Sequence, residues 1–240
     1  RSTRVRSSAV SDVYKRQFEL SEGGNIYTRL QNPTTTAYEQ RIAALYGAVG
    51  ALAVSSGMSA ILIAVLSLAA EGDNIVASPF IYGGTYNLLA HTFPEYGITT
   101  TFVDPFNYDE VEQAIQENTR AIHIETLGNP NSDVVDIEKL AETAHKHNLP
   151  LVMDNTVATA YLVRPIEKGA DIVVNSTSKY INANSDAISG VITDSGAFRW
   201  DKEKYPGMAE YAKFGKFAFT AKLRNGLFRN TGACSVSYTH

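Results

Sequence analysis

The segment Asn175-Ser176-Thr177-Ser178-Lys179-Tyr180 follows a short apolar run, residues 170–174, that is typical of a buried strand. A lysine just beyond the carboxyl end of such a strand lies where open α/β sheets bind their ligands. The hydroxyl groups before Lys179 can donate hydrogen bonds to a phosphate. A partly desolvated lysine can act as an amine nucleophile and form a Schiff base. Taken alone, the segment is best interpreted as an ordinary surface lysine after a strand. The interpretation therefore depends on other residues of the chain.

The first partner is Asp154, which ends another apolar run at residues 149–154, 25 positions before Lys179. Residues 164–169 between the two runs are enough for a short helical turn and a return. Two neighbouring strands would then bring a carboxylate and an amine to one edge of a sheet. Pyridoxal phosphate needs this pair, a lysine for its aldehyde and an acid that keeps its pyridine nitrogen protonated. The alternative is that Asp154 caps a helix or forms a turn.

The rest of the chain alternates between expected strands and helices. We expect helices over 37–46, 59–70, 85–93, 108–116 and 137–147, and strands over 51–54, 75–77, 98–103, 120–124, 149–154, 170–174 and 187–193. Thr36 and Glu39 match a capping box for the first helix, and Pro94 is expected to end the third. This alternation predicts an α/β fold with a mostly parallel, doubly wound sheet and helices on both faces.

Composition places the chain among folded proteins. Its 240 residues are 44% hydrophobic and 19% charged, with a net charge of −4, so we expect neither disorder nor a nucleic-acid partner. The single cysteine, Cys234, excludes an internal disulfide and suits a reducing compartment. The longest apolar stretch, residues 60–70, is too short to span a bilayer. We therefore expect a cytoplasmic protein with no membrane partner.

The two ends differ from the rest. Residues 1–17 hold five basic side chains against one acidic one and show no helical or strand period. An amphipathic targeting peptide is one interpretation. We favour a non-native or disordered tail, and we also expect 236–240 to be non-native. One large domain is then expected over 18–235.

Several other chemistries lack their signatures. Neither a Gly-x-Gly-x-x-Gly motif nor a P-loop occurs. Ser176 and Lys179 match the Ser-x-x-Lys of penicillin-binding enzymes, but the accompanying Lys-Thr-Gly is missing, so we reject that interpretation. His145 and His147 lie two apart on an expected helix and face different ways, so no metal site is predicted.

Two more positions favour a ring that carries a phosphate. Gly57 and Met58 lie between an expected strand and helix, where the N–H groups at the helix start can hold an anion. Tyr82 follows the next strand, where its ring could stack on a cofactor. The alternatives are a glycine turn that merely starts a helix and a half-buried core tyrosine.

Together these motifs carry a family resemblance. In order, the chain contains Tyr27-Thr28-Arg29 with Asn32-Pro33-Thr34, Ser55-Ser56-Gly57-Met58, Tyr82-Gly83-Gly84-Thr85, Asp154-Asn155-Thr156 and Ser176-Thr177-Ser178-Lys179-Tyr180. This set resembles the Cys/Met-metabolism family of pyridoxal-phosphate enzymes over about residues 18–234. The segments 125–130, 133–136 and 222–232 resemble its O-acetylhomoserine sulfhydrylase branch. The implied fold is the large domain of a fold-type I pyridoxal-phosphate transferase.

The resemblance also implies residue roles. Lys179 would bond the cofactor and shuttle protons between substrate carbons, and Asp154 would pair with the ring nitrogen. Asn129 would contact the hydroxyl side of the ring, and Tyr82 would stack on it and assist departure of the γ-substituent. The phosphate would be bound by Ser176, Ser178 and the amides of Gly57 and Met58, and by Tyr27 and Arg29 from a neighbouring subunit.

The implied reaction is γ-replacement, in which acetate leaves O-acetylhomoserine and sulfide or a thiol takes its place. A homo-oligomer is implied, a homotetramer in the family. The alternatives are a γ- or β-lyase of the same family, similar to methionine γ-lyase or cystathionine γ-lyase, and a non-catalytic cofactor-binding module that scaffolds an oligomer.

Two features depart from the family pattern. Where the family commonly has Gly-Gly-His-Gly after the lysine, this chain has Asn182-Ala183-Asn184-Ser185-Asp186. The chain also stops near the end of the large domain, before the smaller C-terminal domain and its carboxylate-binding arginine. We therefore expect the 240-residue chain to bind pyridoxal phosphate weakly and to be inactive.

Overall fold

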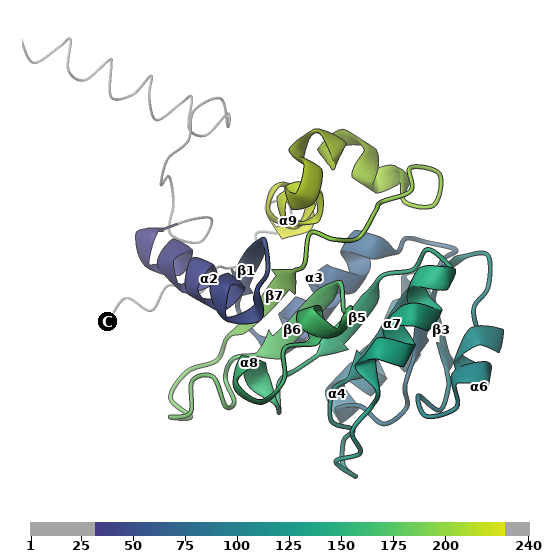
Figure 1. Cartoon of the computed structure of the whole chain (residues 1–240), viewed down its shortest axis with the longest axis horizontal. Coiled ribbons are helices and arrows are strands. Elements are labelled where there is room, and N and C mark those ends of the chain that lie inside the picture. The colour runs from purple at the N-terminus through teal and green to yellow at the C-terminus, as the bar shows by residue number, and fades with distance from the viewer. Residues whose placement is uncertain (1–31, 229–240) are drawn as a thin grey trace, which may run out of the picture.

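The computed structural model describes residues 32–228 of the chain. These residues form a seven-stranded sheet with helices around it (Figure 1). Its order is β1-β7-β6-β5-β4-β2-β3. The strands are β1 Gly50–Val54, β2 Asn74–Ala77, β3 Thr99–Phe102, β4 Thr119–Glu125, β5 Leu151–Asp154, β6 Ile172–Ser176 and β7 Gly190–Asp194.

The sheet is mostly parallel, as predicted, with one strand reversed. Strands β6, β5, β4, β2 and β3 run side by side in parallel, whereas β7 is antiparallel to both β1 and β6. The segment between β6 and β7 contains no crossover helix, and a strand that returns without one pairs antiparallel. The α/β large-domain fold is therefore confirmed, as a mixed sheet.

Each face of the sheet is covered by helices that bury an apolar cluster. On one face, α3 Gly57–Leu68 and α9 Ala218–Leu223 pack Ile61 and Phe219 against Leu52 and Val174. On the other, α2 Pro33–Tyr46 and α7 Ile137–Lys146 contribute Ile42 and Leu140. Figure 1 shows α2 and α7 in front of the sheet and α3 behind it. The remaining helical segments are α4 Gly83–Asn87, η1 Leu88–Thr92, α5 Phe93–Glu95, α6 Tyr108–Gln113, α8 Thr159–Leu162, η2 Pro165–Lys168, η3 Pro206–Phe217 and η4 Arg224–Phe228. No helix within residues 32–228 is long and apolar enough to cross a membrane.

The capping box predicted for the first helix is wrong. The cap is Asn32, whose side chain accepts a hydrogen bond from the Thr35 amide at 2.8 Å, and the helix starts at Pro33. Proline suits this first position because its missing N–H would have had no acceptor there. Glu39 is buried instead, where it accepts from the Ala53 amide at 2.8 Å and pairs with Arg224 at 2.6 Å. The carboxyl thus joins α2 to β1 and to the C-terminal helices.

Pro94 does not end the third helix as predicted. The segment α4 leads into the π-helical turn η1 and then into α5, which contains Pro94 and ends at Glu95. Pro94 has no N–H to donate, and the turn before it is π-helical, with the Phe93 amide bonded to the Leu88 carbonyl. The chain therefore continues through the proline without a break.

Candidate functional site

The carboxyl ends of three neighbouring strands meet at one edge of the sheet. Strand β4 ends at Glu125, β5 at Asp154 and β6 at Ser176. Glu125 is in register with Asp154, and Asp154 with Val174. Asp154 and the segment that carries Lys179 therefore leave the same edge from adjacent strands, as the sequence predicts.

Asp154 is buried and tied to the neighbouring strand through Thr156. Its Oδ1 atom accepts from the Thr156 amide at 2.9 Å and from the Thr156 hydroxyl at 2.5 Å. The same hydroxyl oxygen accepts from the Ser176 amide at 2.8 Å. Burial raises the pKa of Asp154, and the bonds from Thr156 oppose that rise. A cationic partner, such as a protonated ring nitrogen, would stabilise the charged form.

The first turn of α3 lies beside the end of β6. Ser56 caps α3 by accepting from the Ser59 amide at 3.0 Å. The next two amides, of Gly57 and Met58, lie in the first helical turn, where no intrahelical acceptor exists. A Cβ added to Gly57 would lie 2.5 Å from the Ser176 Cβ, so only glycine allows this approach. Within residues 32–228, Ser176 Oγ makes no hydrogen bond, so amides and hydroxyl can face one phosphate.

The Ser178 hydroxyl, unlike that of Ser176, makes hydrogen bonds within the described chain. Its Oγ atom accepts from the Ser189 amide at 2.8 Å and donates to the Ser189 carbonyl at 3.1 Å. The hydroxyl therefore ties the start of the lysine loop to the residue before β7. Its phosphate contact stays a prediction.

Lys179 is exposed rather than partly desolvated in the isolated chain. Its amide donates to the Ser176 carbonyl at 3.3 Å. In the loop that follows, Ala183 and Ser185 have φ angles of 62° and 59°, a region that favours glycine. This departure from the glycine-rich family pattern is thus accommodated with strained backbone beside the site.

Tyr82 lies at the start of α4 with its ring against Gly84. A Cβ on Gly84 would lie 2.5 Å from Tyr82 Cε1 and 3.3 Å from the Met58 sulfur. These distances place the ring close to the first turn of α3. Tyr82 is 53% exposed and therefore lies at the surface rather than in the core.

Of three further predicted residues, only Asn129 lies in the part of the chain that the structure describes. Asn129 is exposed, and its amide donates to the Phe80 carbonyl at 3.2 Å, which anchors the segment after β4 beside the one before α4. Tyr27 and Arg29 lie outside the described residues.

Glu125 is a site residue that motif reasoning missed. It is 7% exposed, and its Oε1 atom accepts from the Tyr82 amide at 2.7 Å. Burial and, to a smaller extent, the neighbouring Asp154 raise its pKa to about 8, and the hydrogen bond from the Tyr82 amide opposes that rise. The signal in the sequence was an acid at the end of an apolar strand, the same pattern that singled out Asp154.

His145 at the end of α7 and its C-cap residue His147 pair with carboxylates. His145 Nε2 lies 2.8 Å from Asp171 Oδ2, and His147 Nε2 lies 3.1 Å from Glu112 Oε1. Within residues 32–228, no three metal-binding side chains gather into a site.

The mixed sheet, with a buried strand-end acid, a lysine just beyond the end of the next strand and the start of a helix beside that strand, defines an α/β domain suited to a phosphate-bearing ring. The chain belongs to the family of Cys/Met metabolism PLP-dependent enzymes, whose model matches residues 3–226. O-acetyl-L-homoserine sulfhydrylase of Leptospira meyeri is 46% identical, over 92% of this chain and 54% of that protein. L-methionine gamma-lyase of Fusobacterium nucleatum subsp. polymorphum is 47% identical over 74% of this chain and 45% of that protein.

A solved structure shares the fold. It is a crystal structure of an O-acetylhomoserine (thiol)-lyase from Campylobacter jejuni subsp. jejuni with N′-pyridoxyl-lysine-5′-monophosphate. It matches with a TM-score of 0.87 and 34% identity over 93% of this chain and 57% of that chain. The chain therefore spans about half the length of the relatives it matches.

Proposed function

We propose that this chain is the cofactor-binding part of an enzyme that replaces the γ-substituent of O-acetylhomoserine. Acetate leaves, sulfide or a thiol is added, and homocysteine or methionine is the product. The observation that carries the proposal is the juxtaposition of Asp154 with the Lys179 segment on adjacent parallel strands, next to the start of α3. A scaffold without catalysis would have no use for a strand-end lysine and a buried acid together.

Each residue then has a part in the chemistry. The amides of Gly57 and Met58, with Ser176 and Ser178, would hold the phosphate, and Tyr27 and Arg29 of a neighbouring subunit would complete that site. Pyridoxal phosphate, when bound, supplies an electron sink that loosens bonds at the substrate's α carbon.

The remaining steps belong to side chains at the sheet edge. Asp154 would keep the ring nitrogen protonated, and Asn129 would contact the hydroxyl side of the ring. The Lys179 Nζ atom would bond the cofactor and then move the proton between the substrate's α and β carbons. Tyr82 would cover the ring and assist departure of the acetate.

A lyase is the second candidate, because the loop after Lys179, which borders the proposed site, departs from the family pattern. Its backbone bends through Ala183 and Ser185 without glycine, and the Asn182 side-chain Nδ2 donates to the Asp186 carboxylate at 2.8 Å. A methionine γ-lyase is also among the relatives of the chain. Elimination would release an α-keto acid rather than homocysteine.

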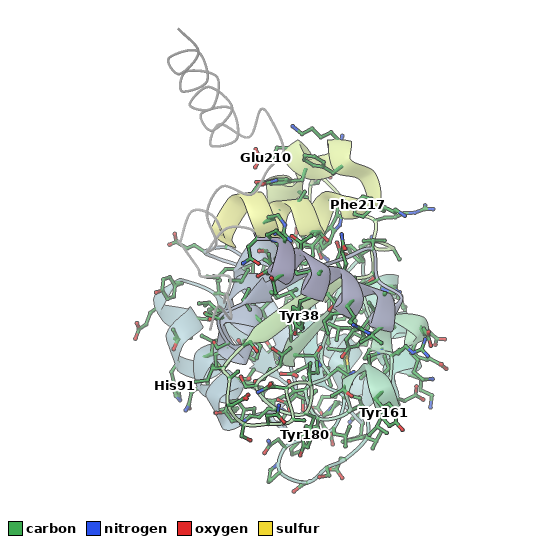
Figure 2. All side chains as sticks on the ribbon, turned by 90° about the vertical axis from the view of Figure 1, so that its left-hand side faces the viewer. Tyr38, His91, Tyr161, Tyr180, Glu210 and Phe217 are labelled. Atoms are coloured by element: carbon green, nitrogen blue, oxygen red, sulfur yellow. The ribbon has the colours of Figure 1, made fainter. Side chains whose placement is uncertain are left out.

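Exposed apolar side chains support assembly of several copies. Tyr161, Leu162 and Tyr180 are 92%, 70% and 66% exposed. Figure 2 shows Tyr161 and Tyr180 at one end of the molecule, opposite Glu210 and Phe217. Apolar surface of this kind commonly marks an interface, so we infer a homo-oligomer in which this end is covered.

Product analysis tests the function. The full-length protein, incubated with pyridoxal phosphate, O-acetylhomoserine and sulfide, should form homocysteine and acetate in equal amounts. Formation of an α-keto acid and ammonia, with or without sulfide, would establish the lyase instead. No product from either route, in a protein that binds the cofactor, would favour the non-catalytic alternative.

A further inference from the structure

Glu125 is a second buried carboxyl group at the edge that holds Asp154. Its register partner on the adjacent strand β5 is Asp154 itself, and neighbouring strands lie about 4.8 Å apart. Its Oε1 atom accepts from the Tyr82 amide at 2.7 Å. Glu125 therefore lies beside the residue that would pair with the ring nitrogen and bonds the one that would cover the ring.

We propose that Glu125 is a positioning residue that holds Tyr82 in place while uncharged, so that Asp154 alone of the two acids carries the negative charge. The proposal rests on the proposed function for the role of the cofactor ring. The protonation state of Glu125, however, is a property of the protein without cofactor and can be measured in that form.

The contact to Tyr82 is structurally important because α4 lacks another cap. Tyr82 is the N-cap residue of α4, and its side chain makes no capping hydrogen bond. Its amide is instead satisfied by Glu125, from a strand 43 residues further along the chain. Loss of this acceptor would free the backbone that orients the Tyr82 ring.

The charge assignment follows from the surroundings of the two acids. Two neighbouring buried carboxylates disfavour simultaneous ionisation. Asp154 accepts two hydrogen bonds from Thr156, whereas Glu125 accepts the single bond from Tyr82. Burial, with Asp154 as the charged neighbour that acts on it, raises the pKa of Glu125 to about 8. The two hydrogen bonds from Thr156 lower the pKa of Asp154 against the rise caused by burial, so Asp154 is the acid of the pair that ionises first.

A glutamine at this position separates the two parts of the proposal. Glu125→Gln keeps an oxygen that can accept from Tyr82 and has the shape of the neutral acid. Glu125→Ala removes the acceptor as well. Glu142→Gln, on the exposed face of α7, is the matched control.

The first measurement is unfolding of the protein without cofactor as a function of pH. An acid whose pKa is raised in the folded state stabilises that state fully below its unfolded pKa, and this stabilisation is lost as pH rises through the folded value. In the wild type, the equilibrium constant for unfolding should therefore increase because of Glu125 as the pH rises from about 4.5 to 8. The increase should be up to about tenfold for each pH unit. The difference between wild type and Glu125→Gln isolates this contribution, because other titrating groups are common to both. Equal slopes in wild type, Glu125→Gln and Glu142→Gln would show that Glu125 is charged when folded and would overturn the proposal.

The second measurement is the dissociation constant for pyridoxal phosphate at pH 7 in the full-length protein. Glu125→Ala should bind about tenfold more weakly, as expected for one lost hydrogen bond that leaves a buried N–H without an acceptor. Glu125→Gln should recover affinity to within about threefold of wild type. Weak binding by both variants would show that the negative charge is needed and would overturn the proposal. If Glu125→Ala does not fold, the comparison of Glu125→Gln with wild type still decides this point.

A wild-type protein that binds no pyridoxal phosphate would overturn the proposed function and, with it, the positioning role. The pH dependence of unfolding would still report the protonation state of Glu125. Failure of the two proposals can therefore be told apart.

Discussion

At the scale of single residues, Asp154 has a structural contact through Oδ1, and we propose a chemical task for its charge. Oδ1 is occupied by the Thr156 amide and hydroxyl, and within residues 32–228 no cation pairs with the carboxylate. Burial without a cation raises the pKa of Asp154. A positively charged partner from outside residues 32–228 would therefore stabilise the charged form of Asp154.

Replacement of Asp154 by Asn should separate these tasks. Asparagine keeps an oxygen for Thr156 but removes the charge that would stabilise a protonated ring nitrogen. Loss of one charged pair at a buried site costs about 2–5 kcal/mol. The kcat/KM of the full-length enzyme should therefore fall roughly 30- to 4,000-fold, measured by homocysteine formation.

The control is Asp109→Asn on the exposed α6, which should leave kcat/KM unchanged. Equal activity in Asp154→Asn and wild type would show that the charge has no part in the reaction.

The residues whose position in the fold the sequence predicted are those that lie at or just after the end of a strand. Asp154 and Lys179 qualify, because an acid or amine after an apolar run goes to the sheet edge in any parallel α/β fold. Thr156 and Glu125 were not predicted, because their roles depend on hydrogen bonds to Ser176 and Tyr82, which lie far away in sequence. Such contacts follow from strand order and register, which local patterns do not specify.

At the scale of elements, helix α2 shows how the cap of a helix is decided. Both Asn32 and Thr36 are good N-cap residues, and Thr36 is followed by an acid at the capping-box spacing. The structure caps with Asn32, because Glu39 is drawn into the core by Ala53 and Arg224. A tertiary contact thus overrides a local motif.

Two alanine substitutions test this assignment. Asn32→Ala should reduce the free energy of unfolding by about 1 kcal/mol, the usual loss for a helix cap. Thr36→Ala lies inside the helix and should change it by less than about 0.5 kcal/mol. The measurement is urea unfolding of both variants, and a larger effect from Thr36→Ala would restore the capping box.

The seven strands and helices α3, α6 and α7 were predicted to within a few residues, because apolar periodicity marks them clearly, whereas α8 and the helical segments η3, α9 and η4 were not predicted. The antiparallel direction of β7 was not predicted, since its sequence is the same kind of apolar run as that of β6. Direction is decided by the connection, and the lysine loop between β6 and β7 contains no helix.

At the scale of the whole molecule, the site lies at an end that the single chain leaves open. Tyr161 and Tyr180 are exposed at that end (Figure 2), and Lys179 is exposed beside Tyr180. A neighbouring copy that covers this surface would also exclude water from the reaction.

Mixed oligomers test whether the neighbour takes part in the site. Arg29 is predicted to bind the phosphate of another subunit, and Lys179 the cofactor of its own. Full-length chains with Arg29→Ala and chains with Lys179→Ala should each be inactive, but a refolded mixture should recover part of the activity, because some sites then combine two intact residues. The control is each variant refolded alone, and a mixture as inactive as its components would place Arg29 in its own subunit's site or in a structural role.

The measurement that tests the central claim most directly is chemical trapping of the cofactor. The full-length protein is incubated with pyridoxal phosphate and reduced with borohydride, which makes the bond to a lysine amine permanent, and the labelled peptide is then identified by mass spectrometry. The sheet-edge site predicts a pyridoxyl group on Lys179, in the peptide that also contains Ser176 and Ser178. A label on Lys168 or Lys202 instead would contradict the account.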